Sequence, residues 1–106
     1  MPVYILENLK GWKSMARAET RELYQNLIRT ELSFVARGRH HITGIYDCVR
    51  SKYPNLCDDS YLCSENCKAG ADQPEWKHIV RGALDALKDK SQQIKKEPQR
   101  GFWVFN

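Results

Sequence analysis

The chain has 106 residues, of which 28% are charged and 42% hydrophobic, a composition typical of one globular domain with a modest core. Its formal charge of +4 permits an anionic partner but does not require one. No apolar run is long enough to span a bilayer, and the interrupted N-terminus does not resemble a secretory signal, so we expect a cytoplasmic protein without a membrane partner.

The first third of the chain predicts an arm followed by a long helix. Residues 1–13 have no sustained periodicity and are predicted to form an N-terminal arm, whereas residues 14–106 are predicted to form the folded domain. A helix is expected from Ser14 to Ala36, ended by Gly38. Its predicted buried face consists of Leu23, Tyr24, Leu27, Ile28, Leu32 and Val35. The basic run from Arg37 to His41 is predicted to be an exposed connector.

A second helix is predicted from Thr43, which serves as its N-cap, to Tyr53. Its apolar face is expected to contain Ile42, Ile45, Tyr46, Val49 and Tyr53. Pro54 should end this helix, because the residue before a proline is pushed out of helical geometry. Residues 55–73 then form a long polar loop, and such loops in compact domains usually have a function or an internal cross-link.

The clearest periodicity runs from Pro74 to Lys90. Its apolar residues form one continuous helical stripe: Trp76, Ile79, Val80, Ala83, Leu84 and Leu87. The opposite face carries Lys77, His78 and Arg81 near the helix start. Most helices of this kind are core helices with a solvated polar face. A helix anchored on one side and basic on the other is also the element that reads a DNA major groove.

The C-terminal residues predict a β-hairpin. Its strands are expected at Gln92–Lys96 and Phe102–Phe105, joined by residues 97–101, whose Pro, Arg and Gly mark a turn. Alternation in the last strand places Trp103 and Phe105 on the face opposite Phe102 and Val104, so one pair should be partly exposed. The predicted fold is mainly α with a small β-hairpin, in the order α-α-loop-α-β-β. This is the order of a winged helix-turn-helix.

Three stretches carry a more specific resemblance. They are IYDCVRSKYPNLCDD from Ile45, PEWKHIVRGALDALK from Pro74, and RGFWVF from Arg100. They resemble the winged-helix module attached to some prokaryotic restriction endonucleases, including Mrr-type and related methylation-dependent enzymes, over about residues 18–105. The resemblance implies a non-catalytic DNA-binding accessory, with catalysis in a separate nuclease domain. We therefore expect a nucleoid-associated module that binds double-stranded DNA and whose other partner is a nuclease domain or a second copy of the chain.

The DNA-binding interpretation assigns roles to seven residues. The base edges are expected to be contacted by Lys77, His78 and Arg81. The phosphates are expected to be contacted by Lys88, Lys95, Lys96 and Arg100. The alternative is a protein-interaction or dimerisation module on the same fold, which would dock through the aromatic last strand or the acidic residues 57–72.

The cysteines raise the question of a structural zinc site. The candidate ligands are Cys48, Cys57, Cys63 and Cys67, with His40, His41 and His78 as substitutes. Their spacing contains no CxxC pair, which favours reduced thiols over zinc. Disulfides are a poor default in a reducing compartment.

An enzymatic hypothesis comes from the pattern D…ExK, which Asp58 or Asp59, Glu75 and Lys77 imitate. In a Mg²⁺-dependent nuclease the carboxylates would hold the metal and the lysine would orient water. On a helix, however, Glu75 and Lys77 point about 200° apart and cannot converge on one ion. We therefore expect no catalytic site here, and we expect Asp58 and Asp59 to accept hydrogen bonds from loop amides.

Overall fold

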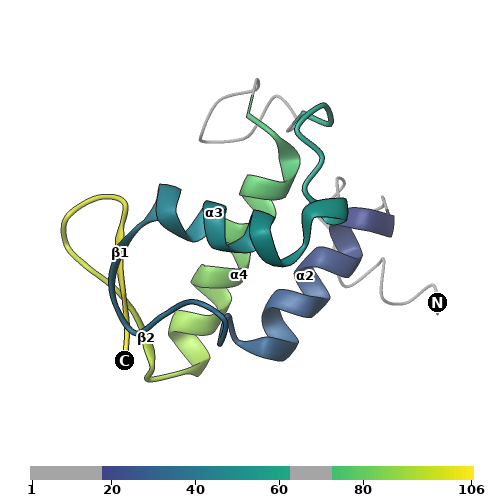
Figure 1. The fold of residues 1–106 in the computed structure, drawn as a ribbon. Helices are drawn as coiled ribbons and strands as arrows, with labels where there is room; N and C mark the ends of the chain where they lie inside the picture. Colours follow the sequence, from purple (N-terminus) through teal and green to yellow (C-terminus); the bar gives the residue numbers. More distant parts are fainter. Residues whose placement is uncertain (1–17, 63–72) are drawn as a thin grey trace.

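The computed structural model describes residues 18–62 and 73–106. Within them, three α-helices accompany one three-stranded antiparallel sheet (Figure 1). The elements are α2 (Ala18–Thr30), β1 (Gly38–His41), α3 (Ile42–Lys52), the short 3-10 helix η2 (Pro54–Leu56), α4 (Glu75–Lys90), β2 (Ile94–Lys96) and β3 (Phe102–Phe105). The three predicted helices and the C-terminal hairpin are confirmed. The predicted N-terminal arm and the predicted helix start at Ser14 lie outside the described residues.

Helix α4 is the centre of the core. All six residues of its predicted stripe are buried, each with at most 2% of its surface exposed. Burying large apolar side chains contributes roughly 1.5–3 kcal/mol each, so this face fixes the helix firmly. In Figure 1, α4 lies between α2 and the sheet, and it packs against both α2 and β2. None of the helices in the described ranges is long and apolar enough to cross a membrane.

Helix α2 ends at Thr30, so the prediction that it continues to Ala36 is wrong. Glu31 and Leu32 both have positive φ angles, 55° and 54°, which no helix can continue through. Leu32 and Val35 are nevertheless buried, as their spacing predicted. The turn keeps these two side chains in the core while it redirects the backbone toward the sheet.

The predicted basic connector is a strand, β1, which pairs antiparallel with β3 from Gly38↔Phe105 to His41↔Phe102. Because β2 pairs with the other edge of β3, the strand order is β1-β3-β2 and β3 is central. The hydrogen bonds that make β1 a strand come from residues more than 60 positions later. Local propensity therefore could not indicate it.

Helix α3 begins at Ile42, and its N-cap is His41 rather than the predicted Thr43. The ring Nδ1 of His41 accepts a hydrogen bond from the backbone N–H of Thr43 at 3.3 Å, the role usually taken by a small polar side chain. The helix ends at Lys52, two residues before Pro54, as the restriction on the residue before proline predicts.

The hairpin agrees with its prediction, except that β2 begins at Ile94 rather than Gln92. Trp103 and Phe105 are buried, whereas Phe102 and Val104 on the other face of β3 are partly exposed. The expected alternation is therefore present. The buried face holds the hairpin against α4 and brings its basic residues close to that helix.

Candidate nucleic-acid interface

A groove of about 270 Å³ lies between α3, α4 and the β2–β3 hairpin. It is lined by Ile42, Tyr46, Arg81, Asp85, Lys96, Arg100, Gly101 and Trp103, and we call it the basic groove. Three of these side chains are cationic and one is a carboxylate. Its net positive lining favours an anionic ligand.

Arg81 is held in place by α3. Its guanidinium donates a hydrogen bond to the hydroxyl of Tyr46 at 3.0 Å, and Arg81 itself is partly buried. The Tyr46 ring meets Trp76 edge-on, with the centroids 5.7 Å apart. A planar guanidinium fixed in this way has lost part of its rotamer freedom before any ligand arrives.

Lys77 lies beside the same aromatic pair. Its ammonium is 5.2 Å from the Tyr46 ring centroid and 5.8 Å from that of Trp76, within the range of a cation–π interaction. Tyr46 therefore brings together Lys77 and Arg81, two of the three residues predicted to contact bases. Both side chains are partly buried, and Arg81 forms part of the groove wall.

His78, the third of these residues, is partly buried, and burial lowers its pKa. Glu75 raises this pKa and Arg81 lowers it, both by smaller amounts than burial. The lowered pKa favours the neutral ring, which has one donor and one acceptor nitrogen.

The residues predicted to contact phosphates divide into two groups. Lys96 and Arg100 line the basic groove, with the Lys96 ammonium 5.7 Å from the centroid of the Trp103 ring. Lys88 and Lys95 lie instead, again with Lys96, around a neighbouring depression of about 640 Å³ at the end of α4. Lys88 also forms an ion pair with Asp85 at 3.3 Å.

The tip of the hairpin is braced by Arg39 of β1, a residue to which the sequence assigned no role. Its guanidinium forms an ion pair with Glu97, donates to the amide oxygen of Gln99 at 2.7 Å, and lies 3.8 Å from the ring centroid of Phe102. Gly101 has a φ of 86°, and a Cβ there would come within 2.9 Å of the His41 ring. Only glycine suits this tight turn.

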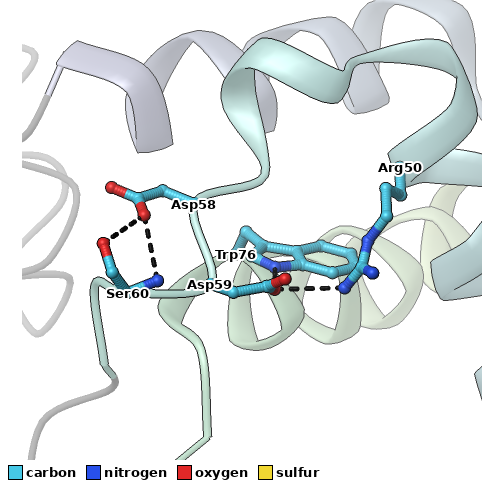
Figure 2. Close-up of polar contacts among 5 residues, drawn as sticks. All are labelled: Arg50, Asp58, Asp59, Ser60 and Trp76. Atoms are coloured by element: carbon cyan, nitrogen blue, oxygen red, sulfur yellow. Dashed lines mark hydrogen bonds and ion pairs between the residues drawn. The ribbon is translucent and has the colours of Figure 1, made fainter.

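The first turn of α4 is tied to α3 through one carboxylate. Figure 2 shows Asp59 between Trp76 and Arg50. Its Oδ1 accepts hydrogen bonds from the indole N–H at 2.8 Å and from the guanidinium at 3.1 Å. Asp58 accepts instead from the backbone N–H and the hydroxyl of Ser60, at 2.9 and 2.6 Å. The expected bond to a loop amide is thus present for Asp58, whereas Asp59 bonds two side chains.

The side chains of the D…ExK pattern differ in burial: Glu75 is buried, Lys77 is partly buried and Asp59 is exposed. Glu75 is 1% exposed, and its Oε2 has no hydrogen-bond partner within the described parts of the chain. Lys77 is only partly buried, and Asp59 faces Trp76 and Arg50. Among residues 18–62 and 73–106, no three His, Cys, Asp or Glu side chains gather closely enough to hold a metal ion. The expectation that no catalytic site lies here stays a prediction.

Two of the four candidate zinc ligands, Cys48 and Cys57, are described, and both are partly buried against the core. Burial raises the pKa of Cys57 to about 11, while Arg50 lowers it and Asp59 raises it by smaller amounts. Cys63 and Cys67 lie outside the described residues, so the zinc site stays a prediction.

Several residues of the basic groove were not predicted to belong to a site. Tyr46 was assigned to a buried face, the alternation of the last strand left open whether Trp103 is buried, and Asp85 was given no role. They come from three different elements and meet only in the folded chain. No local pattern marks such a meeting point, although the helical position of Asp85, one turn after Arg81, was a usable signal.

No protein-family profile matches the chain, and no curated protein or solved structure is significantly similar to it. The function is therefore inferred from the groove and from the elements that form it.

Proposed function

We propose that this chain is a winged-helix module that binds double-stranded DNA. In this proposal α4 enters the major groove and the β2–β3 hairpin is the wing. The order of elements and the strand order β1-β3-β2 are compatible with that fold. The basic groove is the observation that carries the proposal, because α4 and the hairpin both place cations along it.

The dimensions and charge of a duplex suit this surface. B-DNA carries one negative charge per about 1.7 Å of its axis, and its major groove, about 12 Å wide, admits an α-helix. Helix α4 is anchored on its far side by the apolar stripe, so its polar face is presented rigidly. Lys77, His78 and Arg81 then approach the base edges.

The phosphate contacts come from the ends of the interface. Lys96 and Arg100 reach the backbone from the wing, and Lys88 and Lys95 reach it from the end of α4 and from β2. The association with a restriction-type nuclease rests on the sequence resemblance, and in it the module positions a separate catalytic domain. A protein-docking role for the last strand is less well supported, because Arg39 and His41 cover Phe102.

The salt dependence of binding tests this proposal. Four phosphate contacts predict a log–log slope of about −3.6 on duplex DNA, since each contact contributes about −0.9. Fluorescence anisotropy with a short labelled duplex, repeated between about 50 and 200 mM salt, measures this slope. Absence of binding at the lowest salt, or a slope near zero, would contradict the proposal.

A further inference from the structure

The basic groove contains a carboxylate that a surface meant only for phosphates would not need. Asp85 lines it beside three cations, and its side chain is 59% exposed. Its ion pair with Lys88, three residues along the same helix, is exposed to solvent and therefore weak. That pair does not explain why a negative charge faces a ligand site whose other charges are positive.

Asp85 and Arg81 are separated by about one helical turn, roughly 6 Å along the axis. Both line the same groove, and they have opposite hydrogen-bonding capacities. Arg81 is a donor only, whereas an ionised Asp85 is an acceptor only. Because successive base pairs are about 3.4 Å apart, the two side chains can reach the same pair or neighbouring pairs.

The edges of a G·C pair match these two capacities. Guanine presents two acceptors in the major groove, O6 and N7, which suit the planar fork of an arginine. The guanidinium of Arg81 is already oriented by its 3.0 Å hydrogen bond to the Tyr46 hydroxyl. Cytosine presents its N4 amino group, the donor that a carboxylate accepts. Phosphates, by contrast, are repelled by a carboxylate.

We infer that Arg81 and Asp85 together determine base specificity, with Arg81 reading guanine and Asp85 accepting from the amino group of cytosine. This inference rests on the proposed DNA binding. It adds that the DNA sequence recognised contains a G·C pair. Tyr46 is a positioning residue for Arg81.

The test is a selection of duplexes from a pool with a randomised core, made with the full chain and its variants. The wild type is expected to enrich a position occupied by a G·C pair. In Asp85→Asn the cytosine preference should fall by about 5- to 150-fold, the usual discrimination of a good base contact, and should move toward adenine, the base that asparagine reads. Arg81→Lys keeps the charge but loses the planar fork, so the guanine preference in the same motif should weaken.

Asp89→Asn is the matched control for base preference. It makes the same charge change on the same helix at an exposed residue that lines the neighbouring depression beside Lys88, not the basic groove. Its selected motif should equal that of the wild type. The inference is overturned if Asp85→Asn selects the same base motif as the wild type, or if Asp89→Asn loses that motif to the same extent as Asp85→Asn. Duplex binding without base preference overturns it too but leaves DNA binding standing, whereas failure to bind any duplex removes the proposed function itself.

Discussion

Replacing both Lys96 and Arg100 with alanine is expected to weaken duplex binding about 100-fold at low salt. Hydrogen bonds to charged groups contribute about 1.5 kcal/mol at the low end of their range, or roughly tenfold for each contact. The salt slope should also become shallower by about 1.8, because two phosphate contacts are lost. Both side chains are exposed, so the folded state should lose no more than about 1 kcal/mol.

A double variant outside the basic groove separates local contacts from net charge. Arg29→Ala with Lys52→Ala removes the same two positive charges from exposed residues of α2 and α3 that do not line the basic groove. Its affinity should change only slightly in an anisotropy titration. If both double variants weaken binding equally, duplex DNA is attracted by total charge, and the basic groove has no special role.

Trp76→Ala is expected to lower the free energy of unfolding by about 3–5 kcal/mol, the usual cost of removing a large buried aromatic side chain. Trp76 is 1% exposed, and it contacts both Tyr46 and Asp59. Single domains have about 5–15 kcal/mol of stability in total, so the loss is a large fraction. Urea unfolding followed by far-UV circular dichroism measures it.

Trp76→Phe separates packing from the indole hydrogen bond. Phenylalanine keeps most of the ring but removes the donor to Asp59, whose side chain is 57% exposed and can turn to water instead. The expected cost is about 1–2 kcal/mol. A midpoint for Trp76→Ala that lies within error of the wild type would show that the Tyr46–Trp76–Asp59 contacts do not hold α4 in place.

Elements that have a local periodicity were predicted well from the sequence. Elements whose ends or pairing depend on tertiary contacts were predicted less well. The α4 stripe and the last strand were readable because each buries one face of a regular element. The end of α2 was not, because Leu32 and Val35 continue the apolar spacing through a turn that contains neither glycine nor proline. Strand β1 was missed because its partner, β3, lies at the other end of the chain.

The candidate site was predictable in its charges but not in its shape. Arg81, Lys96 and Arg100 were recognisable from the sequence as cations on the predicted helix and hairpin. That they share one groove depends on how the hairpin packs against α4, and that Tyr46 orients Arg81 depends on the crossing of α3 over α4. Such geometry follows from packing between distant elements, which no window of sequence contains.

The most direct test of DNA binding through the basic groove is a titration of the isotope-labelled chain with a short duplex, monitored by backbone amide chemical shifts. Binding as proposed predicts that the largest shift changes fall on α4 between Lys77 and Asp85 and on the hairpin between Lys96 and Gly101, while α2 stays unchanged. Changes concentrated on α2 and η2, or no changes at a DNA excess and low salt, would contradict it.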